Sequence, residues 1–468
     1  MSARTTSVVI LGGGPGGYEA ALVAAQLGAE VTLVEKDGVG GAAVLTDCVP
    51  SKALVATADI MSELDTAAAA GIRLQDHEGD AVTESLADIA VVNRRILDLA
   101  SAQSADIAAR LREVGVRVID GTAMLAGPHD IVATYPDGSE DVIPADVVLV
   151  ATGATPRVMD TAVPDGERIL TWQQIYALPE LPERLVVVGS GVTGAELAQA
   201  YLGLGSQVVL VSSRDRVLPG EDADAAQVIE DVFRRRGMEV LGRSRMAAVS
   251  RTADGVVVRL VDGREVTGSH ALLAVGSIPQ TSGLGLEEAG VRLSRSGHVE
   301  VDRVSRTSAM GVYAAGDCTG VLPLASVAAM QGRLAMSHAL GDTVTPINLR
   351  AVAANIFTDP EIATVGVSQK DLDEGRVEGE AVMLPLSRNA RAKMQGITDG
   401  FVKLFAQPGS GAVLGGVVVA PRASELIFPV AQAVHLRLNV DQIASTSTVY
   451  PSLIGSIAEA ARRLHVAG

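Results

Sequence analysis

The feature that most constrains this fold is a strand, a glycine-rich turn, a helix and a second strand, which occur in this order twice. The segments of the first unit are residues 8–11, 12–17, 18–27 and 31–34, and those of the second are 185–188, 189–194, 195–204 and 208–211. This order of elements is typical of the βαβ motif that binds dinucleotides. The repeat therefore predicts an α/β chain with two Rossmann-like dinucleotide-binding domains.

Charge and hydropathy narrow the possible partners. The 468 residues include 38 Lys and Arg against 55 Asp and Glu, which gives a net charge of −17. So acidic a chain repels nucleic-acid phosphates and anionic lipid headgroups. No stretch approaches the roughly 20 consecutive apolar residues that span a bilayer. We therefore expect no nucleic-acid partner and no stable membrane insertion.

The cysteine count indicates a compartment. Cys48 and Cys318 are the two cysteines of the chain. They are too few for a disulfide scaffold or a cysteine-rich metal site, so we expect no metal and a reducing environment. An apolar strand at residues 8–11 stands where a signal peptide would have a basic region and a longer apolar run. These observations predict a cytoplasmic protein.

The first glycine-rich loop has the complete pattern of a dinucleotide site. Gly12, Gly14 and Gly17 follow a strand and open a helix, and Glu35 ends the next strand. The glycines allow backbone N–H groups to approach a pyrophosphate at the helix N-terminus. The carboxylate of Glu35 can accept both hydroxyls of an adenosine ribose. A turn without a ligand is the alternative, and the combined pattern favours binding.

The second loop differs from the first at the end of its following strand. Its glycines are Gly189, Gly191 and Gly194. The place of the acid is taken by Ser212, which Ser213 and Arg214 follow. A carboxylate there would repel a 2′-phosphate, whereas hydroxyls and an arginine would accept it. The loop thus favours NADPH while leaving NADH open, and the alternative is a solvated surface without a role in phosphate binding.

The segment at residues 40–52 resembles the active-site segment of the pyridine nucleotide-disulfide oxidoreductases, which include lipoamide dehydrogenase and glutathione reductase. Gly40, Gly41, Cys48 and Lys52 occupy matching positions. Two further motifs of this family are resembled, one by the strand end at Thr152 and Gly153 and the other by residues 313–317. The resemblance implies FAD at the first loop and NADPH or NADH at the second. The cofactor contacts that it adds are Gly40, Gly41, Thr152, Gly153, Gly276, Asp317 and Ala325.

Three residues depart from the family pattern. Ala43 stands where the first redox cysteine is expected, and Cys48 keeps the flavin-proximal position. Near the C-terminus, Tyr450 and Gly455 replace the His and Glu that serve thiol chemistry. A dithiol–disulfide cycle needs two sulfurs within bonding distance. We therefore expect no disulfide reductase activity, and we expect Tyr450 either to donate a hydrogen bond to an acceptor or to pack at a dimer interface.

The path of electrons from NAD(P)H to FAD is retained. Lys52 and Glu196 match the family's ion pair beside the flavin, where a cation stabilises the reduced ring. With Cys48 and Tyr450 they form the predicted catalytic set. The variant pattern resembles the family's NAD(P)H:quinone reductases, so a quinone is the expected acceptor. A transhydrogenase, a single-cysteine peroxidase or oxidase, and a non-enzymatic FAD-binding sensor or scaffold are the alternatives.

The remaining pattern completes the predicted architecture. Helices are expected at 51–70 and 82–114, and, within a C-terminal α+β dimerisation domain, at 423–436 and 455–464. The predicted parts are 1–152 (FAD), 153–275 (NAD(P)), 276–345 (a central part completing the FAD site) and 346–468 (interface). By resemblance, the last part places Tyr450 beside the active site of a second copy, so we expect a homodimer.

Overall fold

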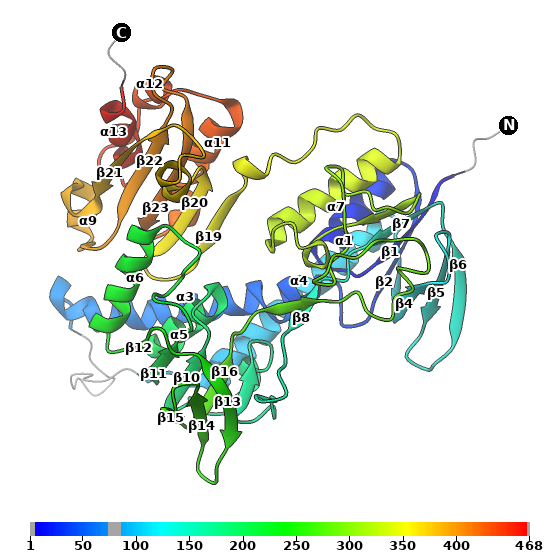
Figure 1. Cartoon of the computed structure of the whole chain (residues 1–468), viewed down its shortest axis with the longest axis horizontal. Coiled ribbons are helices and arrows are strands. Elements are labelled where there is room, and N and C mark those ends of the chain that lie inside the picture. The colour runs from blue at the N-terminus through cyan, green and yellow to red at the C-terminus, as the bar shows by residue number, and fades with distance from the viewer. Residues whose placement is uncertain (1–4, 74–85, 466–468) are drawn as a thin grey trace.

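Three parts surround two long central helices in the computed structural model, which describes residues 5–73 and 86–465. Figure 1 shows the N-terminal sheet on the right, a second sheet below, and the C-terminal domain at the upper left. In the described parts of the chain, no helix is both long and apolar enough to cross a membrane. The mixed α/β architecture confirms the predicted fold class.

The first sheet is parallel, with strand order β18-β7-β1-β2-β3. Its strands are β1 (Ser7–Leu11), β2 (Glu30–Glu35), β3 (Arg117–Asp120), β7 (Val147–Val150) and β18 (Val312–Ala314). Apolar residues fill β1 and β7, as expected for strands that are covered on both faces. Helices α1 (Pro15–Gln26) and α7 (Ala325–Ala339) pack together closely, because Gly332 would place a Cβ only 2.0 Å from the Gly16 carbonyl oxygen.

Two small sheets adjoin this parallel sheet. Strands β4 (Thr122–Leu125), β5 (Asp130–Thr134) and β6 (Glu140–Pro144) form an antiparallel meander. Strands β8 (Ala154–Pro156) and β17 (Ser277–Pro279) pair where the chain leaves and re-enters the first part. Because β18 joins the first sheet, the segment after β17 is a continuation of the first part.

The second parallel sheet has the order β12-β11-β10-β16-β9. Its strands are β9 (Ile169–Thr171), β10 (Arg184–Val188), β11 (Gln207–Val211), β12 (Glu239–Leu241) and β16 (His270–Leu273). The other elements of this part are η2 (Ile175–Ala177), α5 (Val192–Gly203), α6 (Ala223–Arg235) and the antiparallel strands β13 (Met246–Arg251), β14 (Val256–Leu260) and β15 (Glu265–Gly268). This part repeats the strand–turn–helix unit of the first, as the sequence predicts.

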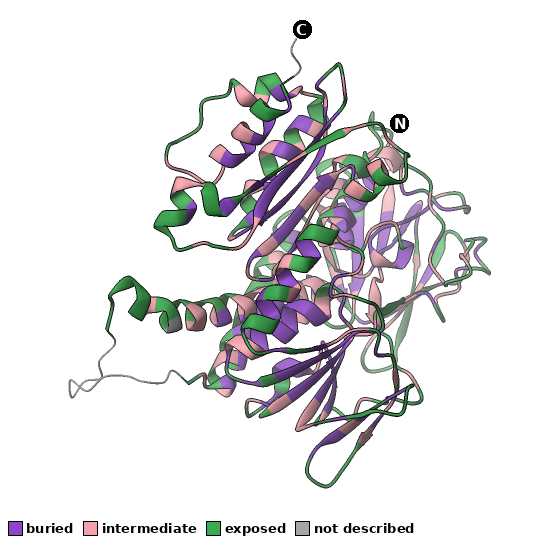
Figure 2. Ribbon diagram, turned by 60° about the vertical axis from the view of Figure 1, so that its left-hand side comes forward, coloured by how far each residue is buried: buried purple, intermediate pink, exposed green. Residues whose placement is uncertain are grey.

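The central helices differ in detail from the prediction. After α2 (Gly41–Leu45), helix α3 (Cys48–Thr66) begins three residues before the predicted start, and its end continues as the 3-10 helix η1 (Ala67–Ala70). Figure 2 shows that the far end of this helix is largely exposed. Helix α4 (Ile89–Glu113) begins where the Asp88 carboxylate accepts a hydrogen bond from Val91 N at 3.1 Å. Residues 82–85 of the predicted helix lie outside the described residues.

The C-terminal domain is an antiparallel sheet with helices against it. The strand order is β19-β20-β23-β22-β21, with β19 (Ala353–Ile356), β20 (Glu361–Gly366), β21 (Glu380–Pro385), β22 (Phe401–Ala406) and β23 (Val413–Ala420). Its helices are α8 (Gln369–Asp373), α9 (Ala390–Met394), α10 (Ala423–Leu426), α11 (Phe428–Leu436), α12 (Val440–Ala444) and α13 (Gly455–Arg463). Short 3-10 turns are η4 (Leu349–Ala351) and η5 (Leu386–Arg388) here, and η3 (Asp317–Thr319) after β18 in the first part. The predicted helix at 423–436 is interrupted, since Pro429 lacks the N–H that would continue α10 and instead lies in the first turn of α11.

One hydrophobic core joins the two central helices, the second sheet and the C-terminal domain, while the first sheet has buried clusters of its own. Leu54 of α3, Leu197 of α5 and Ile362 of β20 belong to one buried cluster, together with residues of the second sheet. Figure 2 shows this buried region continuing from the sheets into the helices between them. The core therefore places α3 and α5 in direct contact, and this contact positions the site described next.

Candidate active site

Both glycine-rich loops use the same close packing of backbone on backbone. Gly12 has φ +100° and would place a Cβ 2.3 Å from the Ala151 carbonyl oxygen, while Gly189 has φ +111° and would place one 2.1 Å from that of Ala274. The last glycine of each loop is equally constrained, since a Cβ on Gly17 or Gly194 would lie within 2 Å of a carbonyl oxygen of its own loop. Side chains at these positions would separate the helix from the strand.

A cavity of about 670 Å³ extends from the first loop to the N-terminus of α3. Its volume falls in the range of small-molecule and cofactor sites. The predicted residues that line it are Gly12, Gly14, Glu35, Gly41, Cys48, Thr152, Gly153, Asp317 and Ala325. Gly17 and Gly40 are not among the lining residues. Gly17 holds the packing of α1, and Gly40 has φ +105° and turns the chain into α2.

Glu35 lies at one end of this cavity. Its Oε2 accepts a hydrogen bond from Gly13 N at 2.6 Å, and its Oε1 accepts one from Asp37 N at 2.8 Å. These two bonds fix the carboxylate beside the loop. Each oxygen retains a further lone pair for a ribose hydroxyl. Together with the N-terminus of α1, this donor and acceptor set fits the adenosine and pyrophosphate of FAD.

The other end of the cavity lies at the turn between α2 and α3, and we call it the flavin end because the resemblance implies that the flavin ring binds there. Ala43, Thr46, Asp47 and Cys48 line it, and Gln173 reaches the Thr46 hydroxyl with its Nε2 at 3.4 Å. Sequence reasoning did not single out Asp47, Trp172 or Gln173 as site residues. The last two follow β9, in the other part of the chain, and carry no motif. Asp47 could have been noticed as an ionisable residue directly before Cys48.

The surviving cysteine of the redox segment is held as a thiol. Both cysteines are free, and Cys318 is fully buried, where its thiol donates hydrogen bonds to the Val150 and Ala315 carbonyl oxygens. Burial raises the pKa of Cys48 to about 12, and the Asp47 carboxylate acts in the same direction. Ala43 supplies no second sulfur. Since the thiolate is the reactive form, Cys48 is a weak nucleophile in this environment.

A buried ion pair joins α3 to α5 beside this end of the cavity. Lys52 Nζ lies 2.7 Å from Glu196 Oε2, and the Glu196 side chain is only 2% exposed. The other oxygen of Glu196 accepts a hydrogen bond from Phe357 N at 2.8 Å. Lys52 Nζ also lies 5.0 Å from the centre of the Phe357 ring. The pair raises the pKa of Lys52 although burial opposes this, so the amine stays charged. Lys52 lies one helical turn beyond Cys48, on the same side of α3.

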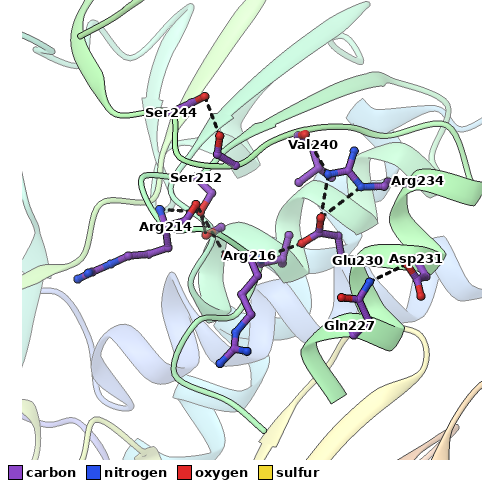
Figure 3. A network of polar contacts seen from close by, with 12 residues as sticks. Ser212, Arg214, Arg216, Gln227, Glu230, Asp231, Arg234, Val240 and Ser244 are labelled. Carbon is purple, nitrogen blue, oxygen red and sulfur yellow. Dashed lines mark hydrogen bonds and ion pairs between the residues drawn. The ribbon is translucent and has the colours of Figure 1, made fainter. Parts of the chain in front are cut away.

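In the loop after β11, the prediction that Ser212 contacts the nucleotide phosphate is wrong. The Ser212 side chain is fully buried, accepts a hydrogen bond from the Ser190 hydroxyl at 2.7 Å and bonds the loop backbone at Arg214. It therefore organises the loop and does not face a ligand. Ser213 and Arg214 are exposed, and Figure 3 shows Arg214 and Arg216 extending away from Ser212. Gly276 follows β16, which neighbours β10, so it lies at the same sheet edge as this loop.

Tyr450 takes no part in these contacts within one chain. It is 85% exposed, it lies in the C-terminal domain between α12 and α13, and it does not line the cavity. Gly455 begins α13. The structure of a single chain thus brings together Cys48, Lys52 and Glu196 but not Tyr450.

Comparison with known families agrees with this geometry. Residues 6–332 match the family described as pyridine nucleotide-disulphide oxidoreductase, and residues 352–461 match its dimerisation domain. The chain belongs to the pyridine nucleotide-disulphide oxidoreductase family. It is therefore a flavin-dependent oxidoreductase that uses a pyridine nucleotide, and it carries the family's dimerisation domain.

Several relatives within this family cover almost the whole chain. A protein of Mycobacterium tuberculosis named NAD(P)H dehydrogenase (quinone) is 56% identical over 98% of this chain and 94% of its own length. The crystal structure of LpdA from the same organism superposes with a TM-score of 0.93 at 55% identity, covering 99% of this chain and 100% of LpdA. A dihydrolipoyl dehydrogenase of Zymomonas mobilis is 32% identical, with 95% of each chain covered.

Proposed function

We propose that the protein is an FAD-dependent NAD(P)H:quinone oxidoreductase. One observation carries this proposal: Ala43 and Cys48 line the same end of the cavity, so the retained redox site has a single sulfur. A dithiol cycle needs a second sulfur within bonding distance. A quinone needs only two electrons and two protons, with no thiol intermediate. The 56% identical relative is named for such an activity.

The residues of the first part hold the flavin. When bound, FAD accepts a hydride from the nicotinamide and passes two electrons to the acceptor. Glu35 binds the adenosine ribose, the N-terminus of α1 binds the pyrophosphate, and Asp317 binds the ribityl or pyrophosphate region. Lys52 places its charge beside the ring, and Glu196 keeps that charge in position. The walls of the flavin cavity are formed in part by Thr152, Gly153, Gly41 and Ala325.

The second loop binds the pyridine nucleotide. Gly189, Gly191, Gly194 and Gly276 lie at one edge of the second sheet, where helix α5 begins. The exposed Arg214 and Ser213 favour the 2′-phosphate of NADPH over NADH.

The functional unit is a homodimer. The C-terminal part matches a dimerisation domain, and Tyr450 lies exposed on it. In this proposal Tyr450 of one subunit faces the flavin site of the other, where its hydroxyl donates to a quinone oxygen.

Mixing the purified holoenzyme with NADPH tests the proposal. The flavin absorbance should bleach within a second, and a naphthoquinone should restore it while lipoamide does not. The Cys48→Ala variant should retain most of the quinone activity, because the buried thiol takes no part. Bleaching without recovery on quinone addition would contradict the proposed acceptor. A loss above about a hundredfold in Cys48→Ala, or roughly 2.7 kcal/mol of barrier, would show that the thiol has a chemical role.

A further inference from the structure

We propose that Asp47 is the acid that protonates the acceptor, by giving the proton of its carboxyl group to a quinone oxygen. This inference rests on the proposed quinone reductase function. A quinone that gains two electrons and one proton from the reduced flavin, the equivalent of a hydride, still needs one further proton to become a hydroquinone. The O–H bond of the Asp47 carboxyl breaks, the second O–H bond of the hydroquinone forms, and the carboxylate regains a proton from solvent.

The orientation of Asp47 is the first observation. Asp47 is the N-cap residue of α3, a position where an aspartate ordinarily accepts a hydrogen bond from the first turn of the helix. Its side chain makes no such bond, and it lines the cavity instead. Asp47 thus lacks the usual capping contact and borders the flavin end of the cavity, where it can act on what binds there.

The other acids around the cavity are engaged elsewhere, which is the second observation. Glu196 is buried with both oxygens bonded, to Lys52 and to the Phe357 backbone, and it does not line the cavity. Glu35 and Asp37 lie at the adenosine end, where Glu35 accepts two backbone hydrogen bonds. Asp317 belongs to the proposed flavin-binding set. Among the described residues that line the cavity there is no histidine.

The electrostatic surroundings suit a proton donor at neutral pH. Burial raises the pKa of Asp47 to about 6, Glu196 and Asp317 act in the same direction, and Lys52 opposes them. The other ionisable groups that face it are Cys48 on α3 and Tyr176 on η2, and burial raises the pKa of both far above neutrality. An acid whose pKa lies near the working pH is an efficient proton donor.

The decisive variant is Asp47→Asn, which keeps the shape of the side chain and removes its proton. Its matched control is Asp59→Asn, which makes the same change about 18 Å further along α3, outside the cavity. FAD content and NADPH-driven bleaching of the flavin should be unchanged in both variants. Reoxidation by a naphthoquinone should slow about a hundredfold in Asp47→Asn alone, the usual contribution of a general acid.

A second acceptor separates proton transfer from a structural role. Ferricyanide takes up single electrons and no proton, so it should reoxidise the Asp47→Asn flavin at the rate of the unchanged protein. With quinone, reoxidation of the unchanged protein should slow as pH rises through about 6, because the protonated carboxyl is the donor. Asp47→Asn should lack this dependence.

A spectroscopic titration tests the inference without turnover. The absorption spectrum of the oxidised holoenzyme should change with a midpoint near pH 6, and this transition should be absent in Asp47→Asn and present in Asp59→Asn. The role of Asp47 would be overturned if a quinone reoxidised the flavin of Asp47→Asn at the rate and with the pH profile of the unchanged protein. It would also be overturned if the variant slowed reoxidation by ferricyanide as much as reoxidation by quinone. The proposed function would instead be overturned if, in the unchanged protein, ferricyanide reoxidised the reduced flavin and a quinone did not.

Discussion

At the scale of single residues, the two nucleotide loops depend on glycines whose neighbours are backbone atoms. A Cβ on Gly194 would lie 1.8 Å from the Gly189 carbonyl oxygen, and neither atom belongs to a flexible side chain. A Cβ on Gly191, two positions after Gly189, would meet no atom within 4 Å, and its φ of −74° suits any residue. Gly194 is therefore required for packing, whereas in the proposed function Gly191 allows the nucleotide to approach the loop.

We expect Gly194→Ala to lower the free energy of unfolding by about 1–3 kcal/mol, the usual range for overpacking. Gly191→Ala should keep the stability of the unchanged protein and weaken NADPH binding, since its methyl group would separate the loop from the pyrophosphate. Urea unfolding measures the first effect, and the NADPH concentration needed for flavin bleaching measures the second. Equal stability of the two variants would contradict this division of roles.

The stability of the folded protein should depend on pH through the protonation of Asp59. Burial raises its pKa from 3.8 to about 6, with Asp359 and Glu361 acting in the same direction. The folded protein therefore favours the protonated form, whose stabilising contribution is complete below about pH 4 and is lost as pH rises through about 6. Asp59→Asn should raise the melting temperature more at pH 7.5 than at pH 4, as measured by scanning calorimetry at both values. A larger gain at pH 4 would contradict this sign.

At the scale of elements, helix α6 is attached to the C-terminal sheet through its first turn. Lys403 of β22 places its Nζ 2.8 Å from Asp222 Oδ2 and 2.6 Å from Asp224 Oδ2. Asp222 also caps α6 by accepting hydrogen bonds from Asp224 N and Ala225 N. The Lys403 and Asp222 side chains are only 4% and 3% exposed, so each buried charge is compensated by the other and not by water. This contact holds the second part against the C-terminal domain, close to the loop that carries Arg216.

Replacing Lys403 by Met should lower the free energy of unfolding by about 3–5 kcal/mol, because it leaves the Asp222 carboxylate buried without its cation. Asp224→Asn is the matched control and should cost about 1 kcal/mol or less, since Asp224 is 57% exposed and Asp222 keeps its partner. Chemical unfolding of both variants measures the difference. A Lys403→Met protein as stable as Asp224→Asn would show that the buried pair contributes little.

The presence of the helices and strands could largely be predicted from the sequence, whereas their first and last residues were harder to predict. The strands around both glycine loops follow from short apolar runs, and the predicted helices are present. The helix at 423–436 was wrong as a single element because Pro429 interrupts its hydrogen bonding. The start of α4 depends on the Asp88 cap, a single side-chain contact within a longer apolar pattern.

At the scale of the whole molecule, the C-terminal domain presents large apolar side chains to solvent. Phe428 and Leu436 of α11 are 62% and 61% exposed, and Val449 and Tyr450 are more exposed still. Apolar groups gathered on a domain of this family are expected to be covered by a second copy. The isolated chain is therefore only part of the functional assembly.

Phe428→Asp should shift the protein toward monomers in sedimentation velocity at micromolar concentration, because it places a charge in an apolar interface. Met310→Asp is the control: Met310 is 87% exposed but lies just before β18, outside the dimerisation domain, so its variant should sediment as the unchanged protein does. Identical sedimentation of the two variants would place the interface elsewhere.

The two dinucleotide units, the family and the departures at Ala43 and Tyr450 could be recognised without coordinates, because glycine positions, apolar runs and single replacements are properties of short segments. Which side chains meet depends instead on how distant segments pack. The Lys52–Glu196 pair, which resemblance suggested, is separated by 144 positions and depends on α3 packing against α5. The burial of Ser212 and the position of Asp47 at the cavity depend on contacts with distant segments, and no local pattern encodes them.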